Sequence, residues 1–184
     1  MKRMLLLIDP QIDFISGSLP VPGAAKALDA LAGYITEQDG TYDCKVITTD
    51  WHPYHHCSFK ENGGPWPMHC VQNSIGAALY PALVQPLYTT QGTVTVLRKG
   101  VDEDKEEYSI FKNPASAAKL RSIIKDRNIG HIDLCGLAGD ICVLNTLKDG
   151  ISIYGPHLFH VLKEYAPSLD GGASLETAIR ELLS

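Results

Sequence analysis

Four side chains suited to chemistry follow short apolar runs of the sequence. Asp9 follows the first run, Asp50 the second and Lys99 the third, and Cys142 lies a few residues after the fourth. A cysteine near a helix N-terminus and beside a cation is favoured as the thiolate, which is the nucleophilic form. A nearby carboxylate can accept the thiol proton and later deliver it to a leaving amine. The pattern predicts acyl transfer from an amide through a thioester.

A second group of residues has the composition of a metal site. Asp50 and His52 are separated by one residue, which places both side chains on the same side of an extended segment. His55, His56 and His69 follow in the next loop. One carboxylate with two or three imidazoles suits Zn²⁺, Fe²⁺ or Mn²⁺, with water completing the coordination. We expect one divalent metal ion, and the residue types do not choose among these three.

A parallel sheet would bring these side chains together. Continuous apolar runs predict five buried strands, at Met4–Ile8, Lys45–Thr49, Val94–Arg98, His131–Gly136 and His157–Leu162. Helical spacing and capping residues predict helices at Ala24–Gln38, from Asn113-Pro114 to Gly130, at Asp140–Ile153 and Ala173–Leu183, with a short one at Ser74–Leu83. The alternation predicts a Rossmann-like, three-layer α/β/α fold with a central, mostly parallel sheet. Ligands of such sheets bind beyond the carboxyl ends of the strands.

The composition is that of an ordinary globular protein, with 45% hydrophobic and 20% charged residues. Its 184 residues predict a single domain spanning residues 1–184. The net charge of −5 argues against a nucleic-acid partner. No apolar stretch approaches the ~18 residues that cross a membrane, and the first apolar run is too short for a secretory signal. We therefore expect a cytoplasmic protein with reduced thiols and no membrane partner.

Five segments carry motifs in a recognisable order. They are Asp9–Phe14 (DPQIDF), Asp50–Phe59 (DWHPYHHCSF), Trp66–Val71 (WPMHCV), Lys99–Phe111 (with KG and YSIF) and Gly136–Val143 (GLAGDICV). Over nearly the whole chain the sequence resembles the isochorismatase-like cysteine hydrolases and, within them, the nicotinamidases, also called pyrazinamidases. The resemblance implies the isochorismatase-like fold. It also implies hydrolysis of nicotinamide to nicotinate and ammonia in NAD salvage, with pyrazinamide as a further substrate.

The resemblance also implies roles for individual residues. The catalytic triad would be Asp9, Lys99 and Cys142. The metal ligands would be Asp50, His52 and His69, with His56 a ligand in some members only. Zn²⁺ is the first expectation for the ion, with Fe²⁺ or Mn²⁺ as alternatives, and it would engage the pyridine nitrogen of the substrate. The other implied site residues are Phe14, Trp66 and Tyr108 around the pyridine ring, and the N–H groups of Ala138 and Cys142 as the oxyanion hole.

The resemblance has departures and leaves alternatives open. Ile12 stands where the family pattern has Asn, and Gly139 where it has Thr. The family often has a cis peptide before the alanine, here Leu137–Ala138. An amidase with the same triad but another small substrate, such as an N-carbamoyl or ureido compound, is the main alternative. A non-enzymatic zinc-binding or redox-sensing module is a third. The partner expected is a small-molecule amide, and a homo-oligomer is left open.

The other cysteines and histidines have simpler interpretations. Five cysteines cannot pair completely within one chain. We interpret Cys44 and Cys135 as packing residues. Cys57 lies in the metal-site loop and is a weak candidate ligand, whereas Cys70 is either structural or a neighbour of the site. The remaining histidines are interpreted as structural or solvated, namely His55, His131, His157 and His160.

Overall fold

The central strand of the sheet is β1 (Lys2–Ile8), whose apolar run Met4–Ile8 is fully buried. The computed structural model describes residues 1–183, and within this range one sheet contains five parallel strands in the order β3-β2-β1-β4-β5. The other strands are β2 (Cys44–Asp50), β3 (Thr93–Lys99), β4 (Ile129–Gly136) and β5 (Phe159–Val161). The predicted parallel α/β fold is confirmed.

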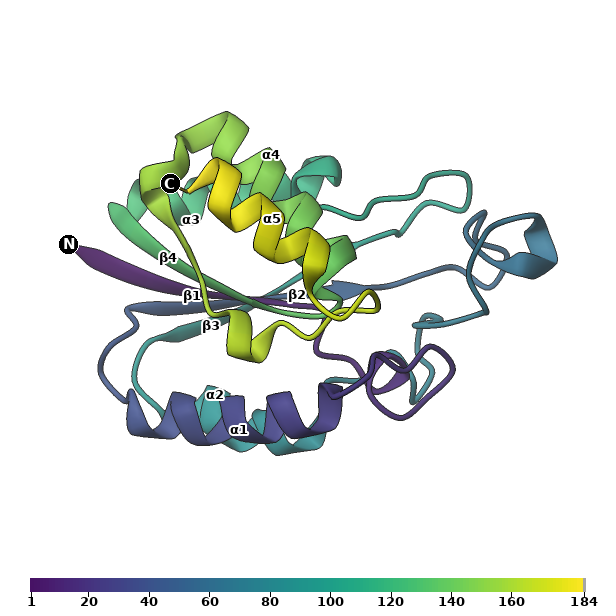
Figure 1. Ribbon diagram of the computed structural model, residues 1–184, viewed down its shortest axis with the longest axis horizontal. Helices are drawn as coiled ribbons and strands as arrows, with labels where there is room; N and C mark the ends of the chain where they lie inside the picture. Colours follow the sequence, from purple (N-terminus) through teal and green to yellow (C-terminus); the bar gives the residue numbers. More distant parts are fainter. Residues whose placement is uncertain (184) are drawn as a thin grey trace.

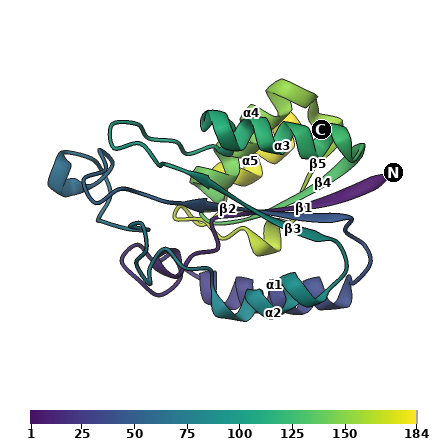
Figure 2. The same ribbon diagram turned by 180° about the vertical axis from the view of Figure 1, so that it is seen from behind.

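Helices cover both faces of the sheet, as Figures 1 and 2 show from opposite sides. One face is covered by α1 (Ala24–Glu37) and α2 (Pro81–Thr89). The other is covered by α3 (Pro114–Asp126), α4 (Leu144–Tyr154) and α5 (Ala173–Leu182). No helix among residues 1–183 has both the length and the apolarity needed to cross a membrane.

Alternate residues of β1 divide between the two halves of the core, because successive side chains of a strand point to opposite faces. Leu5 and Leu7 pack in the cluster that includes apolar residues of α1 and α2. Met4, Leu6 and Ile8 pack in the cluster that includes residues of α3, α4 and α5. A strand buried on both faces explains why the sequence shows a continuous apolar run rather than an alternating one.

The predicted helix at Ser74–Leu83 is wrong. Residues 74–80 form turns, and the helix begins at Pro81. Proline lacks a backbone N–H, which costs nothing at the first helical position because that N–H would have no acceptor within the helix. The backbone of the turn segment is bonded elsewhere: Ile12 N–H donates to Ala78 O at 3.0 Å, and Asp13 N–H to Gly76 O at 3.0 Å. Tertiary hydrogen bonds therefore replace the helical ones over this segment.

Two further boundaries differ from the sequence prediction. Gly130 does not end the helix before it, because α3 stops at Asp126 and Gly130 already belongs to β4. The reversal is made at Asn128, which has φ of 54°; asparagine tolerates this left-handed conformation better than most residues. At the other edge, β5 is shorter than predicted because Pro156–Leu158 forms a 3₁₀ turn.

The strand order reverses direction at β1, so that β2 and β4 flank it on opposite sides. Crossover connections leave the strand ends in opposite directions at this point, which opens a crevice beyond the carboxyl ends of β1 and its neighbours. In Figure 1 the long connections gather at this end of the sheet, away from the N-terminus. The residues that follow β1, β2, β3 and β4 meet here.

Replacing Leu6 with alanine tests the central role of β1. The side chain is fully buried, so Leu6→Ala leaves a cavity and should lower the free energy of unfolding by about 2–5 kcal/mol. Urea denaturation followed by circular dichroism measures this. Ile75→Ala is the control, because Ile75 is 82% exposed and its loss should change stability by less than about 0.5 kcal/mol. Equal effects of the two substitutions would contradict the assignment of the core.

Candidate active site

Lys99, the last residue of β3, lies at the centre of the site. Strand register pairs it with Asp50, the last residue of β2. The buried ammonium group forms ion pairs with the carboxylates of Asp50 and Asp9, the latter at 2.9 Å, and lies 3.5 Å from Cys142 Sγ. Burial alone would lower the pKa of Lys99, but the two carboxylates raise it well above the ordinary value. The group is therefore a permanent cation.

Asp9 follows β1 and is completely buried, with φ of 45°. Its carboxylate accepts a hydrogen bond from Thr48 Oγ1 at 2.6 Å, and its backbone N–H donates to Thr48 O at 3.0 Å. Burial raises the pKa of Asp9, and the opposing effect of Lys99 does not cancel this. A carboxyl group with a raised pKa is suited to taking up and releasing a proton.

Cys142 belongs to a π-helical turn (Gly139–Val143) between β4 and α4. The predicted helix at Asp140–Ile153 therefore begins with this turn, and its α-helical part starts at Leu144. Lys99 contacts both Asp9 and the sulfur of Cys142, and a carboxylate oxygen of Asp9 lies within 4.8 Å of that sulfur. The fold thus brings the three residues of the predicted triad together from three strand ends.

The protonation of Cys142 differs from the sequence-based expectation. Burial raises the pKa of the thiol well above its usual value, and the carboxylates of Asp9 and Asp50 add to this effect, while Lys99 opposes it. The sequence argument considered the cation and the helix end but not burial or the two anions. The protein groups together favour the neutral thiol, so Cys142 would need a base in order to act as a nucleophile.

Asp50, His52 and His69 meet beside this group, with one donor atom of each within 4.8 Å of the others. His52 donates its Nδ1–H to Gly100 O at 3.0 Å, and His69 donates its Nδ1–H to Pro67 O at 2.7 Å. Both imidazoles therefore keep the Nε2 lone pair free, and the buried His52 Nε2 has no hydrogen-bond partner among residues 1–183. This is the arrangement that metal-binding histidines adopt, so these residues fit a divalent cation.

His56 is arranged differently from the other two buried histidines. Its Nδ1 accepts a hydrogen bond from Ser58 Oγ at 2.7 Å, and its Nε2–H donates to Lys105 O at 3.0 Å. Burial lowers the pKa of His56 to about 4, which agrees with a neutral ring. Since both nitrogens are engaged, the ring packs against His52, 4.0 Å between centroids, without offering a lone pair. His55 is exposed, as interpreted from the sequence.

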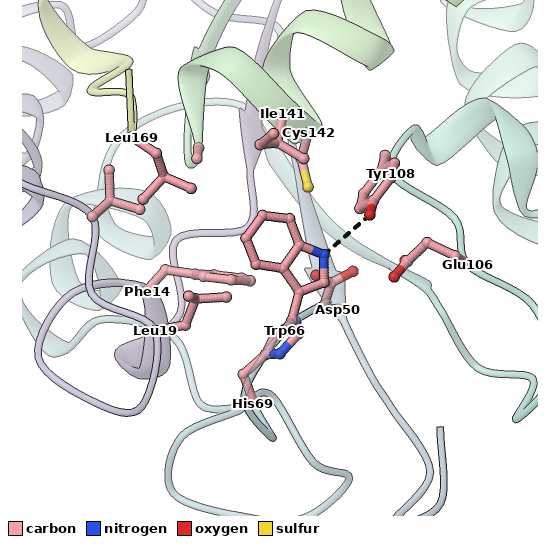
Figure 3. Close-up of a pocket in the computed structure, with 12 residues that line it drawn as sticks. Phe14, Leu19, Asp50, Trp66, His69, Glu106, Tyr108, Ile141, Cys142 and Leu169 are labelled. Carbon is pink, nitrogen blue, oxygen red and sulfur yellow. Dashed lines mark hydrogen bonds between the residues drawn. The ribbon is translucent and has the colours of Figure 1, made fainter. Parts of the chain in front are cut away.

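A pocket opens onto Cys142, as Figure 3 shows. Phe14, Trp66 and Tyr108 line it, and Trp66 Nε1–H donates to the Tyr108 hydroxyl at 3.0 Å. Asp50, His69, Ala138 and Cys142 are also in its wall. Sequence reasoning missed the other lining residues. Ile141 lies within the motif that contains Cys142, and the rest lie in loops without a distinctive pattern, namely Leu19, Val21, Glu106 and Leu169.

The turn before Cys142 supplies backbone donors. Ala138 N–H is not hydrogen-bonded to any group of residues 1–183, and the Leu137–Ala138 peptide bond is cis, as the resemblance implies. Position 139 requires glycine for steric reasons, because a Cβ there would lie 2.3 Å from Ala166 O and 2.3 Å from Ser168 Oγ. The threonine of the family pattern would therefore displace the segment that packs against this turn.

Gln11 is a buried residue whose contribution the sequence did not reveal. Its side-chain amide donates to Asp50 O at 2.7 Å and to Ala77 O at 3.0 Å, and its Oε1 accepts from Asp50 N–H at 2.8 Å. Both backbone groups of Asp50 are thus held by one side chain. Only its place two residues after Asp9 in the first motif could have pointed to it.

The remaining cysteines agree with their interpretation. All five are free thiols, and Cys44 and Cys135 are buried among apolar residues. Cys70 lies next to the site, because its carbonyl oxygen accepts a hydrogen bond from His52 N–H at 3.0 Å. Cys57 does not join the cluster of potential ligands among the described residues.

Comparisons with known proteins agree with this geometry. The isochorismatase domain model matches residues 3–153. A nicotinamidase of Acinetobacter baylyi is 32% identical, and the match covers 98% of this chain and 88% of that protein.

Two solved structures are similar over almost the whole chain. The pyrazinamidase of Pyrococcus horikoshii in complex with zinc has a TM-score of 0.80 and 32% identity, covering 99% of this chain and 94% of that one. PnC1 from L. infantum in complex with nicotinate has a TM-score of 0.82 and 31% identity, covering 98% and 88%. From the match to the family model and the extent of these similarities, the chain belongs to the isochorismatase family of hydrolases.

Proposed function

We propose that this protein is a nicotinamidase, which hydrolyses the amide of nicotinamide to nicotinate and ammonia. The observation that carries the proposal is the thiol of Cys142, beside Asp9 and Lys99, at a pocket that is also lined by Asp50 and His69 of the possible metal site. The nicotinamidase relative and the two solved structures, one with zinc and the other with nicotinate, support it. The product nicotinate is the form that re-enters NAD synthesis, so the reaction belongs to NAD salvage.

The pocket suits a flat heteroaromatic ring. Phe14 and Trp66 offer aromatic faces, and the apolar side chains around them exclude water from a ring placed between them. Pyrazinamide has a ring of the same shape and the same amide, so we propose it as a second substrate. The amide would then project toward Cys142.

Attack begins with a proton transfer. As Cys142 Sγ bonds to the amide carbonyl carbon, its proton passes to the Asp9 carboxylate, so no free thiolate has to persist in the buried site. The carbonyl oxygen takes up the electron pair and accepts hydrogen bonds from the N–H groups of Ala138 and Cys142. Lys99 balances the negative charge that Asp9 and the sulfur share during this step.

Collapse of this intermediate releases ammonia. Asp9 delivers its proton to the amide nitrogen, the C–N bond breaks, and the acyl group remains on Cys142 as a thioester. Asp9 then takes a proton from water, whose oxygen adds to the thioester carbon. The C–S bond breaks, Asp9 returns its proton to the sulfur, and the acid product leaves and loses its own proton to give nicotinate. Asp9 acts twice as base and twice as acid, which fits a carboxyl group with a raised pKa.

The metal residues have a separate task. Asp50, His52 and His69 would hold one divalent cation, and the chemistry it would supply is that of a Lewis acid toward the ring nitrogen of the substrate. The same set of ligands suits Zn²⁺, Fe²⁺ and Mn²⁺, and we propose Zn²⁺ first because the P. horikoshii structure contains zinc. We further propose a reducing compartment, the cytoplasm, since the reaction needs a free thiol at Cys142.

Removing the nucleophile tests the proposal. Cys142→Ala should lower ammonia release from nicotinamide on the order of 10⁴-fold or more, because the acyl-enzyme can no longer form. Cys57→Ala is the matched control and should retain activity, because Cys57 lies outside the pocket. If the wild-type protein, supplied with metal, hydrolyses an N-carbamoyl or ureido amide but not nicotinamide, the substrate assignment is wrong.

Metal removal gives an independent test. Chelation should abolish nicotinamide hydrolysis, and adding Zn²⁺, Fe²⁺ or Mn²⁺ should restore it, with metal content measured in parallel. His69→Ala should weaken metal binding because it removes one of three ligands, whereas His55→Ala should not, since His55 is exposed. Full activity in a protein shown to be free of metal would rule out the role given to these ligands.

Gln11 provides a test of how Asp50 is positioned. Gln11→Leu removes three hydrogen bonds, two of them to the backbone of Asp50, and should weaken metal affinity and kcat/KM by about 10- to 100-fold. Gln72→Ala is the control, because it removes a similar hydrogen bond to Trp51 O at 3.0 Å, one residue further on. A stability loss with unchanged metal affinity would reduce Gln11 to a structural role.

A further inference from the structure

Strands β4 and β5 bring three potential ligands together at one edge of the sheet, outside the pocket. His131 and Asp133 are two residues apart in β4, so their side chains face the same side of the sheet. The parallel register pairs Asp133 with His160 of β5. One donor atom of each of the three side chains lies within 4.8 Å of the others.

The carboxylate of Asp133 is held in a fixed orientation. Its side chain is only 1% exposed, and Oδ2 accepts hydrogen bonds from Arg3 at 2.7 Å and from the Tyr42 hydroxyl at 2.9 Å. Its other oxygen, Oδ1, faces His131 Nε2 at 3.0 Å and His160 Nδ1 at 2.7 Å. The ion pair between Arg3 and Oδ2 keeps the carboxylate of Asp133 an anion.

The two imidazoles can present lone pairs to a cation. The side chains of His131 and His160 are 33% and 57% exposed. The second nitrogen of each ring has no hydrogen bond to another group of residues 1–183. Each ring can therefore carry its proton on the solvent side and turn an unprotonated nitrogen toward Oδ1, without losing a protein contact on the other side.

We propose that His131, Asp133 and His160 form a second binding site for a divalent transition-metal cation such as Zn²⁺, separate from the pocket. Two imidazoles, one carboxylate and a solvent-facing position for water make up a normal set of ligands for this class of ion. Arg3 and Tyr42 orient the carboxylate through hydrogen bonds to its other oxygen, Oδ2, as hydrogen bonds to metal-ligating carboxylates commonly do. None of the three residues lines the pocket or belongs to the cluster of Asp50, His52 and His69, so the two sites are separate.

Such a site would stabilise the edge of the sheet. The edge strand β5 has three residues, and within residues 1–183 it pairs only with β4. A cation bound by His131 and His160 joins the two strands. Because these ligands come together only in the folded chain, Zn²⁺ binding there raises the melting temperature.

The experiment uses the full chain with the pocket ligands disabled. A His52→Ala/His69→Ala variant, stripped of metal, is titrated with Zn²⁺ by calorimetry and melted with and without Zn²⁺. We expect one equivalent to bind and the melting temperature to rise. Adding His160→Gln should weaken this binding about tenfold or more and remove the rise. Adding His157→Gln instead should change neither, because His157 is an exposed histidine outside the cluster.

Wild-type stoichiometry keeps the test independent of whether the double variant folds. The wild type should bind two equivalents of Zn²⁺ and His160→Gln one, while both hydrolyse nicotinamide at the same rate. One equivalent in both proteins, or Zn²⁺-dependent stabilisation that survives replacement of both His131 and His160 by glutamine, would overturn the proposal. Either result would leave the cluster as a hydrogen-bond network around Asp133.

Discussion

The active site depends on one buried cation. The ammonium group of Lys99 contacts the carboxylates of Asp9 and Asp50 and the sulfur of Cys142. Without it, two carboxylates would face each other in a medium of low dielectric constant, where unpaired charges are costly. Lys99 thereby joins the two halves of the site, since we propose Asp9 as the proton acceptor of Cys142 and Asp50 as a metal ligand. A substitution at Lys99 should therefore disturb both halves together.

The parallel sheet makes this arrangement possible. Asp9, Asp50 and Lys99 follow or end three adjacent strands, and Cys142 comes from the turn after the strand on the other side of β1. The strands hold the charged groups rigidly at the bottom of the crevice. The loops beyond them carry the aromatic walls of the pocket, so recognition of the ring and the chemistry at the amide are built from different parts of the chain. Such a division allows a family to change substrate without rebuilding its triad.

The sequence was informative about buried strands and about reactive residues at strand ends, because both leave a local pattern of residue types. Strands buried on both faces left continuous apolar runs, and Asp9, Lys99 and Cys142 stood at strand ends where chemistry is expected. The sequence was uninformative about which side chains contact each other across the fold. The contacts of Gln11 with Asp50, or the register that gathers His131 and His160 around Asp133, leave no local pattern. Burial also reversed the expected state of the Cys142 thiol, because the sequence does not show how deeply a residue lies.

The most direct test is to observe Cys142 adding to a carbonyl inside the pocket. Pyridine-3-carbaldehyde carries the ring of the proposed substrate but has no leaving group, so attack stops at a hemithioacetal in which the thiol proton has moved to oxygen. With a ¹³C-labelled aldehyde carbon, NMR of the wild-type protein should show a tetrahedral carbon signal that is absent from Cys142→Ala and retained in Cys57→Ala. An unreacted aldehyde on the wild type, or an adduct that persists without Cys142, would contradict the account.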